Sequence, residues 1–317
     1  MSDLDASNAA EERTPNTPVL DEPRFEGSVR LRDGRDLGFA EFGPVTGRAM
    51  LWFHGSPGAR RQIAPEARAL AHERGVRIIA VERPGIGDST PHAYAELIDF
   101  AADIEQLCDA LGIGQFVLAG LSGGGPYALA CAHEMPERIV AVAVLGGVAP
   151  TMGPDAVEGG ANALIRTFSP LLKWTWGPLG ASMRRLIRVL EPWADPAIDL
   201  FARAMPPGDQ RVFNEPGTRR MFQEDLILGS RNHMHALWLD AMLFGRHWGF
   251  TLEDVRVPVF LRYGDADVIV PSAHGEHMAD RLPDSELRVY PGEGHVGSLG
   301  ASHEIFDALL ARWPELS

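Results

Sequence analysis

The chain is poor in cysteine and in positive charge. Its 317 residues include two cysteines, Cys108 and Cys131, which excludes a disulfide-rich scaffold. Both lie in segments expected to be helical, so we predict buried thiols rather than a disulfide. Lys and Arg number 29 against 43 Asp and Glu, which gives a net charge of -14. Nucleic acids and anionic membrane surfaces bind concentrated positive charge, so neither is expected as a partner.

Long apolar runs are also missing. No stretch approaches the roughly 20 residues of a membrane-spanning helix, so no stable membrane anchor is expected. The first residues are acidic and lack the basic start and apolar stretch of a signal peptide, which predicts a cytoplasmic location. Residues 1–24 are polar with almost no apolar pattern and are predicted to be a disordered leader. The oligomeric state is left open by the composition.

Beyond this leader, short apolar runs alternate with helix-like segments. Strands are predicted for a hairpin over 25–42, which turns at Asp33-Gly34, and for 49–53, 77–81, 116–119, 139–145, 257–263 and 286–290. Helices are predicted for 62–74, 94–111, 126–133, 272–282 and 301–313. Such alternation is typical of an α/β fold, with a mostly parallel sheet covered by helices on both faces.

The alternation stops over residues 151–252, where helix-like segments are broken by Pro and Gly. We predict an inserted helical cap, or lid, between two core segments, 25–150 and 253–317, at the edge where open α/β sheets bind ligands. The stretch holds most of the tryptophans and methionines, which favours an apolar substrate pocket. Trp174, Trp176 and Trp238, with Leu121 of the core, are the predicted lining residues. Any single aromatic could instead simply pack the cap onto the core.

Residues 120–125 read GLSGGG, between the predicted strand at 116–119 and a predicted helix. This is the context of a nucleophile elbow, a sharp turn that exposes a serine at the N-terminus of a helix. The turn needs residues with little or no side chain two positions before and two after the serine, and Gly120 and Gly124 meet that need. We therefore predict Ser122 as a nucleophile. No Lys follows the glycines, which argues against a phosphate-binding loop.

A serine nucleophile needs a histidine base and a carboxylate that orients it. His295 lies in a glycine-rich loop after the last predicted strand, whereas three other late histidines belong to predicted helices: His274, His277 and His303. Asp267 follows the strand at 257–263 and is the preferred acid. Asp265 is expected to bond backbone in its own turn, and Asp155 is a third candidate.

The oxyanion of acyl transfer needs backbone N–H donors. One is expected from Gly123, directly after the nucleophile. The other is expected from the loop HGSPG at 54–58, where Pro57 has no N–H and Ser56 is the better donor. No metal or organic cofactor is required, and His233, His235 and His247 do not form a zinc pattern.

Together the HGSPG loop, RPGIGDS at 83–89, the elbow, residues 264–271 and Gly294-His295 resemble the α/β-hydrolase superfamily. The resemblance implies an α/β-hydrolase fold with an eight-stranded sheet and the insertion as its lid. It also implies that Ser122, His295 and Asp267 form the triad, with Ser56 and Gly123 as the oxyanion hole.

The leading hypothesis is a serine esterase that cleaves a small-molecule carboxylic ester with an apolar group through an acyl-enzyme. An alternative is an amide or peptide hydrolase similar to proline iminopeptidases, which would pair a substrate ammonium with cap acids such as Glu191, Glu215, Glu224 or Asp225. A second alternative, from another class, is a ligand receptor that keeps the triad but turns over slowly.

Overall fold

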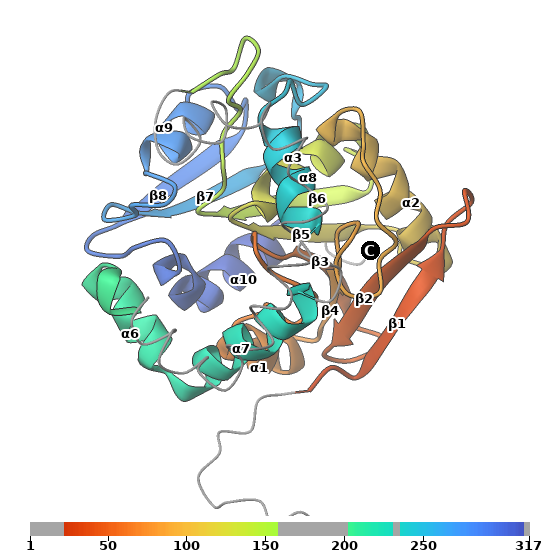
Figure 1. Cartoon of the computed structure of the whole chain (residues 1–317), viewed down its shortest axis with the longest axis horizontal. Coiled ribbons are helices and arrows are strands. Elements are labelled where there is room, and N and C mark those ends of the chain that lie inside the picture. Colours follow the sequence, from red (N-terminus) through yellow and green to blue (C-terminus); the bar gives the residue numbers. More distant parts are fainter. Residues whose placement is uncertain (1–21, 158–201, 231–234, 314–317) are drawn as a thin grey trace, which may run out of the picture.

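The computed structural model describes residues 22–157, 202–230 and 235–313. Its centre is a sheet with the strand order β1-β2-β4-β3-β5-β6-β7-β8 (Figure 1). The strands are β1 (Phe25–Arg30), β2 (Asp36–Phe42), β3 (Arg48–Phe53), β4 (Val76–Val81), β5 (Phe116–Leu121), β6 (Ile139–Leu145), β7 (Val259–Gly264) and β8 (Ser285–Tyr290). The β1–β2 and β2–β4 pairs are antiparallel, and all other neighbours are parallel. The predicted fold class, a mostly parallel eight-stranded sheet, is confirmed.

The helices of the core follow the strands in the predicted order. They are α1 (Pro65–Glu73), α2 (Phe100–Ala110), α3 (Gly124–Glu134), α9 (Ala273–Ala279) and α10 (Ser302–Ala311), with 3-10 turns η1 (Leu97–Asp99) and η4 (Gly297–Ala301) before α2 and α10. The prediction that a helix begins at residue 62 is wrong. α1 begins at Pro65, because proline fits the first helical position, and Gln62 instead accepts a hydrogen bond from the backbone of Gly55.

The sheet is buried on both faces because its central strands are mostly apolar, and β5 and β6 carry no charged or polar side chain. Along β3, Leu51 and Phe53 pack into one apolar cluster with α2 and α3, whereas Met50 and Trp52 pack into a second cluster with α1 and α10. Figure 1 shows these helices on opposite sides of the strands. Cys108 and Cys131 are free and buried, as predicted. Over the described ranges, no helix has the length and apolar character needed to cross a membrane.

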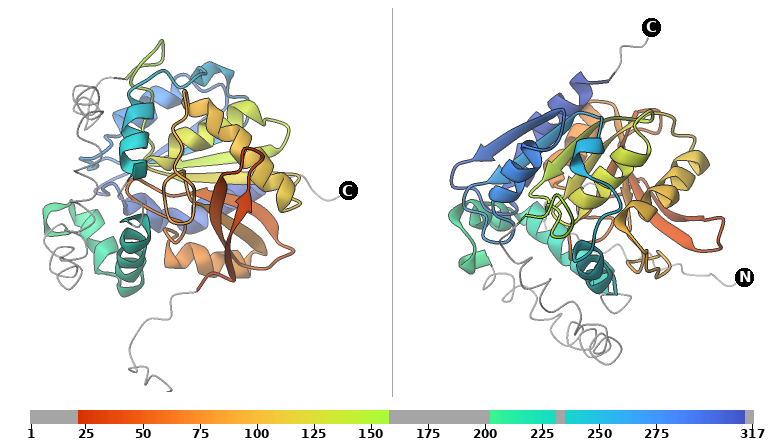
Figure 2. Two further views of the ribbon diagram at one scale, coloured as in Figure 1. Left: turned by 45° about the vertical axis from the view of Figure 1, so that its right-hand side comes forward. Right: turned by 90° about the horizontal axis from the view of Figure 1, so that it is seen from above.

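The described part of the predicted cap is helical and contains no strand. It contributes α6 (Pro207–Asn214), α7 (Pro216–Ser230) and α8 (His235–Phe244), followed by the turn η3 (Leu252–Asp254). Figures 1 and 2 show α6 and α7 next to each other. Trp174, Trp176 and Glu191 lie outside the described residues, as do residues 1–21 of the predicted leader. The boundaries of the cap and of the leader stay predictions.

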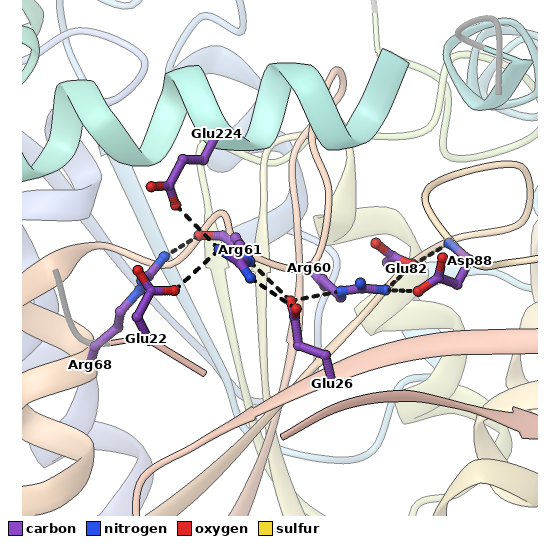
Figure 3. A network of polar contacts seen from close by, with 8 residues as sticks. All are labelled: Glu22, Glu26, Arg60, Arg61, Arg68, Glu82, Asp88 and Glu224. Carbon is purple, nitrogen blue, oxygen red and sulfur yellow. Dashed lines mark hydrogen bonds and ion pairs between the residues drawn. The ribbon is translucent and has the colours of Figure 1, made fainter. Parts of the chain in front are cut away.

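An ion network joins β1 to α7 through the loop that precedes α1 (Figure 3). The guanidinium groups of Arg60 and Arg61 both donate to Glu26 of β1 at 2.9 Å. Arg61 also lies 3.5 Å from Glu224 of α7, so one arginine bridges the N-terminal strand and the predicted cap. Partial burial alone would raise the pKa of Glu26, but the hydrogen bonds and charges of Arg61 and Arg60 together lower it to about 2.

Glu82 is the fully buried member of this network. One of its carboxylate oxygens accepts from Arg60 at 3.0 Å and from the backbone of Asp88 at 2.8 Å. A Cβ atom on either Gly38 or Gly87 would overlap the carboxylate, so two glycines make room for it. Burial raises the pKa of Glu82 to about 7, against the opposing effect of the Arg60 charge.

This raised pKa predicts that Glu82 makes the stability depend on pH. The folded chain holds a proton that the unfolded chain releases near pH 4.5, so the contribution is present below that pH and is lost as the pH rises through about 7. We expect the free energy of unfolding, measured by urea titration, to fall less between pH 4.5 and 7.5 in Glu82→Gln than in the wild type. The comparison is of pH slopes, because the variant also weakens the Arg60 pair at every pH. Equal slopes would contradict the prediction.

Candidate active site

Ser122 lies at the sharp turn between β5 and α3. Its φ is 52°, and among the described residues it is the only one other than glycine with a positive φ. Such backbone persists only where surrounding structure enforces it. A Cβ atom on Gly120 would lie 2.6 Å from the carbonyl oxygen of Gly124, and one on Gly124 would overlap the carbonyl oxygen of Phe53. The two glycines therefore let α3 begin against the ends of β5 and β3, and this close packing leaves Ser122 at the turn.

The structure brings Ser122, His295 and Asp267 together from three separate loops. The Nε2 atom of His295 lies 2.8 Å from the Oγ atom of Ser122, and its Nδ1 atom lies 2.7 Å from Oδ2 of Asp267. The other carboxylate oxygen of Asp267 accepts from the backbone of Ile269 and Val270, both at 2.8 Å. The acid is thus held at both oxygens, and the imidazole lies between acid and hydroxyl, as a base that is oriented by a carboxylate requires.

The other two candidate acids bond elsewhere. Asp265 does not bond backbone in its own turn as expected. It accepts from the backbone of Gly292 at 2.7 Å and so supports the loop that carries His295. Asp155 accepts from the backbone of Leu252 at 2.8 Å and pairs with Arg281 at 3.0 Å. Asp265 therefore holds the histidine loop, whereas Asp155 ties the chain after β6 to Leu252 and Arg281, and the imidazole bonds Asp267 instead.

The three competing histidines have partners outside the site. Nδ1 of His274 bonds the backbone N–H of Ala149 at 3.2 Å, and Nε2 of His277 bonds the carbonyl oxygen of Asp155 at 2.8 Å. His303 lies 3.4 Å from Glu66 on the outer surface. In the described ranges, no group of His, Cys, Asp or Glu could hold a metal ion.

The loop at 54–58 lies directly beside the nucleophile turn. The backbone N–H of Gly55 donates to Gln62 at 2.6 Å, which fixes the loop against the segment before α1. A Cβ atom on Gly123 would overlap the hydroxyl oxygen of Ser56, so the two predicted oxyanion donors belong to adjoining segments. Among the described residues, neither the N–H of Ser56 nor that of Gly123 donates to a protein acceptor.

A buried polar cluster that the sequence did not indicate holds the Ser56 loop against α8. Asp240 of α8 accepts from the hydroxyl of Ser56, from Arg83 at 2.8 Å and from the hydroxyl of Tyr127 at 2.6 Å. Arg83 also donates to Ser56 at 2.7 Å and to the carbonyl oxygen of Gly55 at 3.0 Å. Burial, with Asp240 alongside, raises the pKa of Tyr127 well above its usual value, so the phenol stays a donor.

A small hollow opens at this cluster, lined by Ser56, Pro57, Arg83 and Ile86 of the core and by Leu237 and Asp240 of α8. Leu121, a predicted lining residue, is buried and packs in the apolar cluster shared with α1 and α10. Trp238 lies on α8, but its side chain is outside the described residues. Pro57, Ile86 and Leu237 give the hollow apolar walls, and the ion pair of Arg83 with Asp240 lies beside the Ser56 loop.

The comparisons with known proteins agree with this architecture. Residues 48–172 match the family model of the alpha/beta hydrolase fold. The chain is 32% identical over 313 residues to a proline iminopeptidase of Neisseria gonorrhoeae, across 92% of this chain and 94% of that protein. The chain belongs to the α/β-hydrolase superfamily.

Solved structures show the same fold at lower identity. A thermophilic esterase from Thermogutta terrifontis is similar with a TM-score of 0.62 and 23% identity, over 90% of this chain and 96% of that one. An esterase from Exiguobacterium antarcticum is similar with a TM-score of 0.66 and 18% identity, over 90% of this chain and 98% of that one.

The packing at the turn predicts a large effect of one added methyl group. We expect Gly120→Ala to lower the free energy of unfolding by roughly 1–3 kcal/mol or more, because its Cβ meets backbone that cannot move aside. Gly114→Ala is the matched control, since a Cβ there has no neighbour within 4 Å and its φ is not positive. The control should leave stability unchanged or raise it by about 0.4–1 kcal/mol. Equal urea midpoints for the two variants would refute the packing argument.

Proposed function

We propose that this protein is a serine esterase that hydrolyses carboxylic esters with an apolar group through an acyl-enzyme intermediate. The observation that carries the proposal is the unbroken hydrogen-bonded series from Asp267 through His295 to Ser122. A serine placed in this way can be deprotonated as it attacks, which an isolated hydroxyl cannot. The strained φ of Ser122 supports the proposal, because backbone strain of this kind clusters at functional sites.

In the acylation step, Oγ of Ser122 attacks the ester carbonyl carbon while its proton passes to Nε2 of His295. Negative charge builds up on the carbonyl oxygen, where the N–H groups of Ser56 and Gly123 stabilise it. The bond to the alcohol oxygen then breaks, and His295 donates its proton to the leaving alkoxide. Asp267 keeps the imidazole in the required tautomer and stabilises its charged form.

Deacylation repeats these steps with water in place of the alcohol. His295 takes a proton from water as the water oxygen attacks the acyl carbon, and the same N–H groups stabilise the second oxyanion. The bond between the acyl carbon and Oγ breaks, and the proton on His295 returns to Ser122. The products are the carboxylic acid and the alcohol, and no cofactor takes part.

Two described acids of the predicted cap, Glu224 and Asp240, are paired with arginines, which supports an ester over a substrate with a free ammonium group. Asp225 is buried and accepts from the backbone of Ala59 at 2.8 Å, and burial raises its pKa to about 7. Glu224 accepts from Arg220 at 2.7 Å, and Asp240 is paired with Arg83. Glu224 and Asp240 are therefore already paired with arginines, whereas one carboxylate oxygen of Asp225 has no hydrogen-bond partner among the described residues. Glu215 is exposed, and its carboxylate lies 3.4 Å from the hydroxyl of Thr218.

A proline iminopeptidase activity is the second candidate. It is favoured by the 32% identity to the Neisseria gonorrhoeae enzyme over almost the whole chain. The two reactions share one acyl-transfer mechanism, and they differ in whether the site holds an N-terminal proline and expels an amine.

The proposal predicts that hydrolysis depends on Ser122. We expect the wild type to hydrolyse p-nitrophenyl esters, and Ser122→Ala to lower kcat/KM by about 10⁴-fold or more, because the acyl-enzyme cannot form. Ser28→Ala, an exposed serine on β1, is the control and should retain wild-type activity. Varying the acyl chain from acetyl to long chains reports the depth of the apolar pocket.

Two further outcomes would contradict the proposed esterase function. Hydrolysis of proline p-nitroanilide with much higher kcat/KM than any ester would favour the iminopeptidase. Tight binding of an ester without steady-state turnover by the wild type would favour a receptor. Mass spectrometry of Ser122 after brief mixing with the ester separates this last case from slow deacylation, because it detects the acyl group on the serine.

A further inference from the structure

The carboxylate of Asp209, on α6, lies against the loop that carries His295. Its Oδ2 atom accepts from the backbone N–H of His295 itself at 2.9 Å. Its Oδ1 atom accepts from the N–H groups of Val296 and Gly297, each at 3.0 Å. Three successive backbone donors therefore converge on one side chain that comes from a distant part of the sequence.

This carboxylate is almost completely buried, with Asp209 1% exposed. Within the described ranges no Lys or Arg forms an ion pair with it, so the three N–H groups compensate its burial. Burial still raises the pKa of Asp209, against the lowering effect of these hydrogen bonds. A buried anion is costly to keep, and here its one evident effect is on the conformation of the histidine loop.

Helix α6 lies so close to the loop that there is no room for a side chain at Gly294 of the loop or at Gly208 of the helix. A Cβ atom on Gly294 would overlap the Asp209 carboxylate, and one on Gly208 would lie 2.6 Å from the carbonyl oxygen of Gly292. The opposite side of the loop is bonded to the core, since Ala266 donates to the carbonyl oxygen of Glu293 at 3.0 Å. The loop is therefore held between the end of β7 and α6.

We propose that Asp209 is a positioning residue for His295. By binding the backbone of the histidine loop, Asp209 fixes the position of the imidazole relative to Ser122. The inference rests on the proposed serine hydrolase function. Asp267 bonds the ring and sets its tautomer, but it does not hold the backbone that carries the ring, and the bonds from Asp265 and Ala266 hold the loop at Gly292 and Glu293, before the histidine. Asp209 holds the backbone at the histidine and at the two residues after it.

The test depends on the two roles of His295. Both p-nitrophenyl and ethyl esters need it as a base, but only the ethyl ester needs it as an acid, because ethoxide must be protonated as it leaves and p-nitrophenolate need not be. Poor alignment of His295 should therefore lower the rate on ethyl butyrate more than on p-nitrophenyl butyrate. A loss of folded protein alone would lower both rates by the same factor.

We would measure kcat/KM on both butyrates for the full chain and for Asp209→Asn. The amide keeps the size of the side chain but replaces one acceptor oxygen with a donor that faces a backbone N–H. We expect the ratio of the ethyl to the p-nitrophenyl rate to fall about tenfold or more, since misplacement of a catalytic group by about 1 Å can cost 10²-fold. Arg211→Ala is the matched control, because this exposed α6 side chain contacts Glu293 of the same loop but no catalytic residue. Its ratio should stay at the wild-type value.

Gly208→Ala is a second variant in case Asp209→Asn does not fold. It displaces α6 from the loop while it leaves the carboxylate intact, and it should lower the same ratio. An unchanged ratio in whichever of these variants folds would overturn the inference. Failure of the proposed function would be seen separately, as wild-type protein without ester hydrolysis or as full activity in Ser122→Ala.

Discussion

The close approach of α3 to the ends of β3 and β5 is the constraint on which the rest of the site depends. Gly120 and Gly124 let backbone meet backbone there, and the chain can pass through the turn only with Ser122 in the left-handed region. The energetic cost of that conformation is offset by the buried parallel sheet, whose central strands are apolar on both faces. A stable core thus places the Ser122 hydroxyl at its edge, and His295 and Asp267 reach it from two other loops.

Those other groups come from loops that are held from two directions. The core supplies Asp267 and the strand ends from which the loops begin. Helices α6 and α8 supply Asp209 and Asp240, and each of these carboxylates bonds a different loop beside Ser122. Because both acids are buried and bonded to several donors, they fix conformation more effectively than surface ion pairs could.

Much of this architecture could be predicted from the sequence. The apolar runs and the glycine-rich turn are local signals. They indicate where strands lie along the chain, the sharp turn at Ser122, and loops around Asp267 and His295. The start of α1 was predicted too early, because Gln62 has a tertiary partner in Gly55 that no local pattern reveals. The same holds for Asp209, Asp240 and Arg83, whose partners lie far away in sequence. A single acid among the apolar residues of α8 was the only available sign of Asp240.

The anchoring of both loops by residues between 202 and 252 bears on how such a protein can diversify. A replacement for this segment that lacked carboxylates at these two places would leave three backbone donors without acceptors and the buried Arg83 guanidinium without its counter-charge. If the predicted cap also forms the walls of the proposed pocket, those walls and the geometry of both loops depend on the same segment of the chain. A chimaera made by grafting a foreign cap onto this core would have to carry over Asp209 and Asp240 with it, whatever the new walls of the pocket were.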